Sequence, residues 1–475
     1  MSRRPVWPRI PTFWCPQCHV PLLTPHCDRC GEEGKRIRLT DPGDIRPTFG
    51  AEAARIRDTV VRFFGNQALH ALALTGPLYV NKVPALDEGV EIVVDGYRIG
   101  TVDYHPVDDQ WRFKPSASTA LLLARLGAPS VTVEEEPRRA GCRVTRLSVV
   151  CDDAGDAPGA IVINKEGLPV AFALRLHGVL RIARIYRKVP TKSLELHPNA
   201  PLPHAIEANR TAIHQLFSQA VVFLFRILRK HHTPYVSVSG GKDSLACLLI
   251  ATELGVRTAL FNDTGLELEE TMDAAIEHSD RLGVQLLIAG AGDAFLRGLH
   301  TFGLPARDYR WCCKVCKLAP VARLSKREGF SMAIVGQRRL ESLARSRSPP
   351  VWRNRWLPWL LCVSPINDWT ALAVWLFLIS RGFSVSEINP LYAACFDRIG
   401  CWICPACELA EFKQLFTIKP SYEALYHRLA FTATGLPPDH PYVKYALWRW
   451  KRPTRDASII AHFTGFNYQE QPPPP

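Results

Sequence analysis

Hydrophobic and polar positions change their period along the chain. From about Thr48 to Thr75 the pattern predicts one helix, and between Leu78 and about Arg187 it changes to short β-like runs that are broken by glycine-bearing turns. Between Ala205 and Lys230 apolar residues recur at steps of three and four, which predicts a second long helix.

The remaining chain alternates strands and helices. Strands are predicted at 234–239, 257–262, 284–289 and 331–336, and helices are predicted near Asp243, Leu268 and Val321. Alternation of this kind is typical of a parallel sheet with helices on both faces. The predicted fold class is therefore α/β, with a parallel-sheet domain in the second half of the chain.

Length and composition agree with several folded domains. The 475 residues allow two to four domains, and 47% hydrophobic with 22% charged residues excludes disordered and collagen-like chains. We expect four parts: a cysteine-bearing segment at 1–47, a helix with a small β-rich module at 48–200, the parallel-sheet domain at 201–430 and a C-terminal extension at 431–475.

Charge and apolar run length indicate partners and compartment. The 58 Lys and Arg against 45 Asp and Glu give a net charge of +13, which favours a polyanionic partner such as nucleic acid or a nucleotide. Apolar runs stay short of the roughly 18 residues that a membrane span needs, and the first residues lack the apolar stretch of a secretory signal. We expect a cytoplasmic protein without membrane contact, whose 15 cysteines serve as metal ligands or catalytic thiols.

The most informative motif is Ser239-Gly240-Gly241-Lys242-Asp243-Ser244, between an apolar strand and a helix. Its glycines let backbone N–H groups approach phosphate oxygens, and the helix N-terminus adds positive potential. Lys242 can neutralise a pyrophosphate, Ser239 and Ser244 can donate hydrogen bonds, and Asp243 can cap the helix or organise Mg²⁺. The motif predicts a nucleotide site with Lys242 and Asp243 as catalytic candidates; the alternative is an ordinary glycine turn.

This loop resembles the PP-loop of ATP pyrophosphatases, which cleave ATP between the α and β phosphates and often adenylylate a substrate. Four further stretches resemble the phosphoadenosine phosphosulfate (PAPS) reductase family: 261–267, 335–342, 365–369 and 389–404. The resemblance covers about Ala205 to Leu415 and implies an adenine nucleotide alpha hydrolase-like domain, in which the ends of parallel strands share one crevice.

The resemblance also implies further residues that bind ATP or a sulfated adenine nucleotide. These are Asp263, Thr264 and Gly265 on the adenosine side, and Gly336, Arg338, Glu341 and Ser342 at the phosphate or sulfate end. Arg338 is the third catalytic candidate. The plain alternatives are a strand-end turn at 263–265 and a helical ion pair between Arg338 and Glu341.

Two cysteine clusters predict metal centres. The paired spacing of Cys15, Cys18, Cys27 and Cys30 is typical of a structural zinc ribbon, with His19 and His26 as adjacent alternative ligands. The second cluster comprises Cys312, Cys313, Cys316, Cys401, Cys404 and Cys407.

Part of the second cluster, namely Cys312, Cys313, Cys401 and Cys404, resembles the [4Fe-4S] ligands of sulfonucleotide reductases. In that reading, Lys314 and Lys317 stabilise the cluster, and Cys316 and Cys407 are further possible ligands. The alternative is a second zinc site formed by Cys313, Cys316, Cys401 and Cys404.

The sequence departs from the reductases in one respect. They share a C-terminal Glu-Cys-Gly-Leu-His segment whose cysteine attacks sulfur, whereas no cysteine follows Cys407 here. The intact Lys242 is also more typical of enzymes that consume ATP.

Two features favour an RNA substrate. Residues 153–175 faintly resemble the PUA fold of RNA-modifying enzymes, with any small β-barrel as the alternative. An arginine-rich stretch at 338–355 is interleaved with Trp352 and followed by Trp356, and its alternative is a solvated charged face. We expect ATP-dependent adenylylation and sulfur transfer to a tRNA base, with a sulfur carrier or electron donor protein as a possible partner. The alternatives are sulfonucleotide reduction to sulfite and a non-catalytic nucleotide- and RNA-binding iron-sulfur protein.

Overall fold

The computed structural model describes residues 6–188, 194–230 and 233–470. The N-terminal segment forms a small antiparallel sheet of β1 (Thr12–Cys15), β2 (Val20–Leu22) and β3 (Lys35–Ile37), in the order β2-β1-β3. Trp14, Val20 and Leu22 are buried within the largest apolar core, so this segment packs on the rest of the chain.

Two five-stranded sheets follow, where the sequence predicted one small β-rich module. The first has the order β4-β5-β6-β7-β8 and comprises β4 (Arg46–Pro47), β5 (Tyr79–Lys82), β6 (Gly89–Val94), β7 (Tyr97–His105) and β8 (Gln110–Pro115). The second has the order β10-β9-β11-β12-β13 and comprises β9 (Ser130–Val133), β10 (Val149–Asp152), β11 (Gly159–Ile163), β12 (Pro169–Leu176) and β13 (Val179–Ile185). The stretch at 153–175 therefore lies in the second sheet.

The predicted helix from Thr48 to Thr75 is two helices, α1 (Gly50–Phe64) and α2 (Gln67–Ala71). Gly65 separates them with a φ of 73°, a conformation that glycine adopts without strain. A third helix, α3 (Ala117–Arg125), follows β8, and a short 3₁₀ turn, η1 (Val144–Arg146), precedes β10.

The second long helix is also interrupted, giving α4 (Leu202–Ala208) and α5 (Arg210–Leu228). At the break, the Asn209 side chain accepts a hydrogen bond from the Leu23 amide at 2.7 Å and donates one to the Pro21 carbonyl at 2.9 Å. Contact with the N-terminal sheet thus overrides the helical period. By length and composition α5 could cross a membrane, which the apolar run lengths did not predict, although core helices pass the same test.

The predicted α/β domain is confirmed. Its six-stranded sheet has the order β16-β15-β14-β17-β19-β18, in which β18 alone pairs antiparallel. The strands are β14 (Pro234–Val238), β15 (Thr258–Phe261), β16 (Gln285–Ile288), β17 (Met332–Val335), β18 (Val351–Asn354) and β19 (Leu357–Val363).

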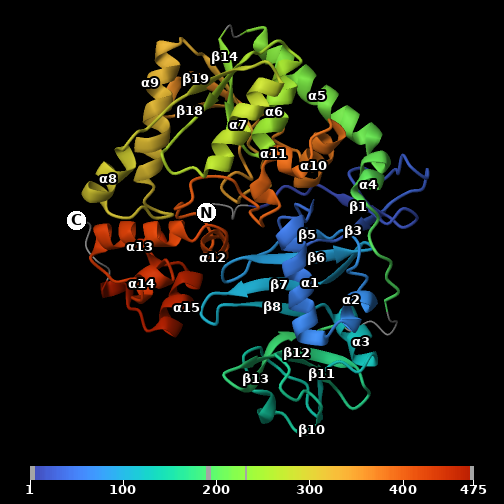
Figure 1. Ribbon diagram of the computed structural model, residues 1–475. Helices are drawn as coiled ribbons and strands as arrows, with labels where there is room; N and C mark the ends of the chain where they lie inside the picture. The colour runs from blue at the N-terminus through green and yellow to red at the C-terminus, as the bar shows by residue number, and fades with distance from the viewer. Residues whose placement is uncertain (1–5, 189–193, 231–232, 471–475) are drawn as a thin grey trace.

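Helices surround this sheet in the upper part of Figure 1. They are α6 (Lys242–Thr252), α7 (Glu269–Arg281), α8 (Ala294–Phe302), α9 (Ala319–Arg327), α10 (Ala371–Ser380) and α11 (Val385–Ile388). Two irregular turns also occur here, the π-helical η2 (Cys313–Leu318) and the 3₁₀ turn η3 (Pro390–Tyr392).

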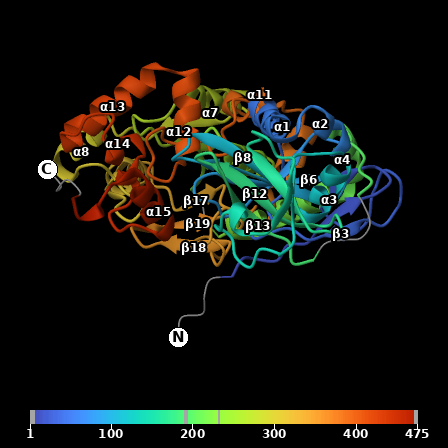
Figure 2. The ribbon, with the colours of Figure 1, turned by 90° about the horizontal axis from the view of Figure 1, so that it is seen from below.

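The C-terminal helices lie to one side of the antiparallel sheets in both views (Figures 1 and 2). They are α12 (Leu409–Ile418), α13 (Ser421–Thr434), α14 (Pro441–Lys444) and α15 (Arg455–Thr464), with the 3₁₀ turns η4 (Leu447–Arg449) and η5 (Tyr468–Glu470). Their aromatic core includes Tyr426, Tyr442 and Trp448 and is continuous with Trp311 and Trp402 beside the second cysteine cluster.

Candidate functional site

The loop from Ser239 to Ser244 joins β14 to α6, as predicted. Gly240 has a φ of 65°, and a Cβ there would lie 2.2 Å from the Thr271 carbonyl oxygen, so only glycine fits. The Ser244 hydroxyl makes two hydrogen bonds within the loop. It accepts one from the Ser239 amide at 3.1 Å and donates one to the Gly241 carbonyl at 2.8 Å. The loop therefore has a fixed shape at the N-terminus of α6, where anions bind favourably.

Charged side chains converge on this loop. Lys242 Nζ lies 3.0 Å from one Asp243 oxygen, and Arg338 Nε lies 2.7 Å from the other. Burial lowers the pKa of Lys242, but Asp243 beside it outweighs burial and raises the pKa overall. Both cations therefore stay charged in a site where a polyphosphate would meet them.

Asp44, just before β4, completes the group. Its carboxylate lies 2.8 Å from Arg338 Nη1 and also accepts the Ala371 amide hydrogen bond at 2.6 Å, at the start of α10. Arg338 is only 3% exposed, so its guanidinium is held between Asp44 and Asp243. The N-terminal half of the chain thus contributes directly to the loop's electrostatics.

Residues 389–392 support the loop from outside. Tyr392 Oη accepts the Lys242 amide hydrogen bond at 3.0 Å, and Asn389 Nδ2 donates to the Gly240 carbonyl at 2.9 Å. Both side chains are buried. One amide and one carbonyl group of the loop are therefore already satisfied by side chains from outside it.

Gly336 packs directly on the loop from the end of β17. A Cβ at this position would lie 2.5 Å from the Asp243 carbonyl carbon and 2.7 Å from the Ser244 nitrogen. The glycine therefore allows β17 and the start of α6 to approach closely.

We expect Gly336→Ala to weaken nucleotide binding by roughly 10- to 100-fold, because such overpacking costs about 1–3 kcal/mol and would displace the loop. Titration calorimetry with ATP measures the effect. Gly290→Ala is the matched control, because Gly290 also lies beyond a strand of this sheet and has nothing within 4 Å of its Cβ position. Equal affinity in both variants would argue against the role of Gly336.

The segment 263–265 follows β15, next to the loop. Asp263 accepts the Gly265 amide hydrogen bond at 2.8 Å, and Gly265 has a φ of 75°, so the segment forms a tight turn. Thr264 is buried; its hydroxyl lies 2.9 Å from Glu267 Oε1 and 3.5 Å from Cys401 Sγ. The turn therefore joins the nucleotide edge of the sheet to the second cysteine cluster.

The other predicted phosphate-end residues lie further along the same connection. Glu341 pairs with Arg345 rather than with Arg338, so the helical ion pair considered as an alternative is not formed. Ser342 accepts the Arg345 amide hydrogen bond through its carbonyl at 2.9 Å and keeps its side chain partly exposed.

The second cysteine cluster gathers two distant segments. Cys312, Cys313 and Cys316 lie at η2, and Cys401, Cys404 and Cys407 lie in the loop before α12. A pocket opens beside the second group, lined also by Lys317, Arg398 and Glu411. A π-helical turn such as η2 is frequent at functional sites.

The pKa values of these thiols are shifted in opposite directions. Hydrogen bonds from Cys312 and Cys407 lower the pKa values of Cys313 and Cys404 respectively, and Lys317 adds to both shifts. Burial raises the pKa of Cys401 to about 11.

One predicted cation lies elsewhere. Lys317 faces the thiols as predicted, whereas Lys314 is exposed and lies 5.1 Å from the centre of the Trp356 ring. Arg398, which the sequence did not single out, faces Cys404 and Cys407.

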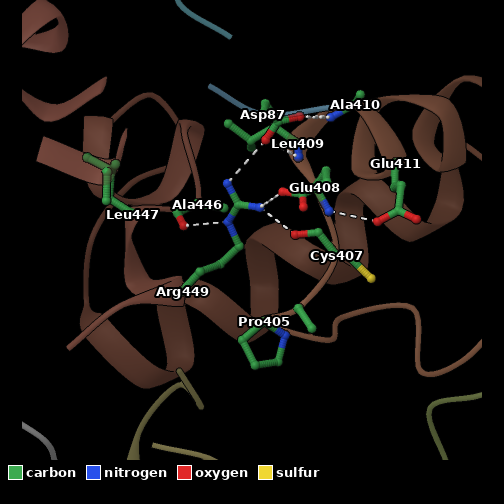
Figure 3. Close-up of polar contacts among 12 residues, drawn as sticks. Asp87, Pro405, Cys407, Glu408, Leu409, Ala410, Glu411, Ala446, Leu447 and Arg449 are labelled. Carbon is green, nitrogen blue, oxygen red and sulfur yellow. Dashed lines mark hydrogen bonds and ion pairs between the residues drawn. The ribbon is translucent and has the colours of Figure 1, made fainter. Parts of the chain in front are cut away.

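The loop that carries Cys404 and Cys407 is held by a buried arginine (Figure 3). Arg449 is fully buried, donates to the Cys407 carbonyl, and lies 3.5 Å from Asp87 and 3.6 Å from Glu408. Arg307 donates to the same Cys407 carbonyl at 3.1 Å. The five-stranded sheet β4–β8 and the C-terminal helices thus meet at the cysteine loop.

Asp87 also caps the helix that follows. Its two carboxylate oxygens accept the amide hydrogen bonds of Leu409 and Ala410 at 2.8 and 3.0 Å, at the N-terminus of α12. A carboxylate is stabilising in this position because the first helical amides lack intrahelical partners.

In the N-terminal sheet, Cys15, Cys18, Cys27 and Cys30 have their sulfur atoms all within 4.8 Å of one another. This is compatible with one metal ion at tetrahedral spacing, since Zn–S bonds of about 2.3 Å place the sulfurs roughly 3.8 Å apart. The four-cysteine cluster fits a zinc ribbon. The alternative ligand His19 turns its Nδ1 towards Asp95, at 2.8 Å, rather than towards this cluster.

We expect Cys27→Ser to remove one zinc ion per chain, because Cys27 is fully buried among the four ligands. Metal analysis by plasma mass spectrometry counts the ion. Cys151→Ser, at an exposed cysteine outside both clusters, should leave the zinc content unchanged. Unchanged zinc in both variants would contradict a metal at the ribbon.

Comparison with known proteins agrees with this geometry. Residues 233–407 match the family model described as the phosphoadenosine phosphosulfate reductase domain. An uncharacterized protein of Methanocaldococcus jannaschii is 29% identical and covers 93% of this chain and 97% of its own length. A second uncharacterized protein of that organism is 25% identical and covers 79% of this chain and 89% of its own.

Solved structures similar to part of the chain include two relevant proteins. The PAPS reductase of Candida auris is 16% identical and covers 40% of this chain and 94% of its own, with a TM-score of 0.31. The U34-tRNA thiolase of Methanococcus maripaludis with its [4Fe-4S] cluster is 15% identical. The match covers 58% of this chain and 90% of the thiolase, with a TM-score of 0.28. The match to the phosphoadenosine phosphosulfate reductase domain thus spans residues 233–407, which include the loop at Ser239, the turn at 263–265 and the second cysteine cluster.

Proposed function

We propose that this protein uses ATP to adenylylate a base in RNA, most specifically tRNA, and then replaces the activated oxygen with sulfur. The observation that carries the proposal is the contact between Thr264 and Cys401, at 3.5 Å. It brings the second cysteine cluster to the strand end beside the PP-loop, so a nucleotide and a sulfur-handling group can serve one substrate.

The chemistry needs two displacements. A carbonyl oxygen of the base attacks the α-phosphorus of ATP, and the bond to the β-phosphate breaks to release pyrophosphate. Hydrosulfide then attacks the activated carbon, the C–O bond breaks, and AMP leaves with the oxygen; the hydrosulfide proton passes to solvent or to a base. Oxygen leaves far more readily as AMP than as hydroxide, and neither step changes the oxidation state of the sulfur.

The chain's own residues have separate roles in this scheme. Lys242 and Arg338 balance the negative charge that develops on the departing pyrophosphate, and the amides of Gly240 and Gly241 bind its oxygens. Asp243, between the two cations, positions them and can take part in binding Mg²⁺.

For the second cysteine cluster we propose an iron-sulfur cluster rather than zinc. The support is the adjacent pair Cys312-Cys313 together with the later pair Cys401 and Cys404, a pattern that resembles [4Fe-4S] ligands. We propose Cys312, Cys313, Cys401 and Cys404 as its ligands; when bound, the cluster would supply a site for sulfide.

Surface chemistry near this cluster supports a nucleic-acid substrate. The β18–β19 hairpin exposes Trp356 at 50%, with Lys314 and Arg355 within about 5 Å of its ring centre. Lys314 belongs to the cysteine turn η2, so the aromatic and basic patch adjoins the proposed cluster. Exposed aromatic rings beside cations suit the stacking of single-stranded bases.

The test is incubation of the anaerobically purified protein with ATP, Mg²⁺, sodium sulfide and unmodified tRNA. We expect AMP, pyrophosphate and a thiolated nucleoside, in equal amounts, by nucleoside mass spectrometry. Protein with Cys404→Ser should lose the cluster and the thiolated product, whereas Cys142→Ser, outside both clusters, should retain them. No thiolation and no RNA-dependent pyrophosphate would contradict the proposal.

The cysteine cluster also favours a second candidate, reduction of adenylyl sulfate or PAPS to sulfite. Against it stands the intact Lys242, which is more typical of enzymes that consume ATP. Thiol-dependent sulfite release from either sulfonucleotide would establish this function instead. Binding of nucleotide and RNA without any product would favour a non-catalytic role.

A further inference from the structure

Three side chains converge at a place that the proposed function does not use. His19 lies in the turn after β1, Asp95 in the turn between β6 and β7, and His197 in the segment before α4. Nδ1 of His19 lies 2.8 Å from Asp95 Oδ1, and Nδ1 of His197 lies 3.1 Å from Oδ2. One potential ligand atom from each of the three lies within 4.8 Å of the other two.

This group is separate from the zinc ribbon. Although His19 directly follows Cys18, its ring nitrogen faces Asp95, and the four ribbon cysteines complete a tetrahedral site without it. The rings of His19 and His197 lie with their centres 4.7 Å apart on the two oxygens of one carboxylate.

The backbone around the three side chains is fixed. The Asp95 amide donates to Asn199 Oδ1 at 2.8 Å, and the buried Asn199 side chain donates in turn to the Pro77 carbonyl at 2.8 Å. The Ala200 amide donates to the His19 carbonyl at 3.1 Å. A metal would therefore find the three donors already held together, which reduces the entropic cost of assembling the site.

We propose that His19, Asp95 and His197 bind one divalent first-row transition-metal ion. Two imidazoles and one carboxylate are borderline donors that suit zinc, cobalt or nickel and leave coordination positions for water. The Asp95 side chain is 10% exposed and the His197 side chain is 63% exposed, so the site has a fixed anion and an open path from solvent.

Binding requires a change of tautomer and a rotation of the Asp95 carboxylate. Without metal, the two Nδ1–H groups donate to the Asp95 carboxylate. With metal, each imidazole carries its proton on Nε2, Nδ1 donates its lone pair to the ion, and the carboxylate oxygens rotate to become ligands. The ion would join three segments that are far apart in the sequence: the ribbon, the first antiparallel sheet and the chain entering the α/β domain.

Cobalt(II) is the probe for this site, because its visible bands report its ligands. The full chain that retains one zinc ion, at the ribbon, is dialysed against CoCl₂, and bound cobalt is counted by plasma mass spectrometry. We expect one cobalt per chain whose spectrum shows d–d bands without thiolate charge transfer. Cobalt bound at either cysteine cluster would show that charge transfer.

Two variants make the test specific. His197→Ala should lower the affinity for this cobalt by at least tenfold, and it should fold because His197 is mostly exposed. His214→Ala, at an exposed histidine of α5, should bind cobalt like the wild type. Equal cobalt binding in His197→Ala and wild type, or cobalt with thiolate bands only, would overturn the proposal.

Discussion

Replacing Lys242 with alanine is expected to lower the rate of pyrophosphate release from ATP by about 10²–10³-fold. The ammonium group is buried beside Asp243 and is preorganised where charge would develop on the leaving phosphates, and loss of one such group has effects of this order. A coupled pyrophosphate assay, with saturating ATP and RNA, measures the change in rate.

The matched control is Lys165→Ala. Lys165 lies in the turn between β11 and β12 and forms an exposed ion pair with Glu134, just after β9, so its removal should leave the rate unchanged. Circular dichroism verifies that both variants fold. A Lys242→Ala protein that folds and releases pyrophosphate at the wild-type rate would contradict the role given to this lysine.

Replacing Arg449 with alanine is expected to destabilise the protein by about 3–5 kcal/mol. Arg449 is fully buried against Asp87 and Glu408, and its loss leaves the Asp87 carboxylate buried without its cation. It also removes a hydrogen bond to the Cys407 carbonyl, so the cysteine loop should loosen. Urea denaturation measures the free energy of unfolding. The iron content per chain shows whether the loosened cysteine loop still holds the proposed cluster.

Two comparisons isolate the buried charge. Arg452→Ala, at an exposed arginine three residues further on, should change stability by less than about 0.5 kcal/mol. Arg449→Lys should be more stable than Arg449→Met, because it keeps a cation beside Asp87 and Glu408 at a similar side-chain volume. Equal stability of the Arg449 and Arg452 variants would contradict the account.

The parallel sheet and the PP-loop could be predicted because their signals are local. Alternating strands and helices mark the sheet, and the strand, the glycines and the helix start around Ser239 to Ser244 lie within a few residues of one another. The ribbon was predictable for the same reason, since the spacing of its four cysteines already places them on two tight turns.

Contacts between distant segments could not be predicted. Asp44 pairs with a guanidinium 294 residues away, and Asp87 pairs with Arg449 at a separation of 362. Nothing in the sequence around Asp44 distinguishes it from an ordinary turn aspartate. The breaks at Gly65 and Asn209 could not be predicted from periodicity, because they depend on the backbone conformation of a glycine and on contacts between Asn209 and the N-terminal sheet.

The central claim is that the PP-loop binds the phosphates of an adenine nucleotide. Titration calorimetry of the pure full-length chain with Mg²⁺ and ATP tests it most directly. The account predicts one saturable site per chain, weakened by at least tenfold in Lys242→Ala. The absence of saturable heat with the folded wild-type protein would contradict it.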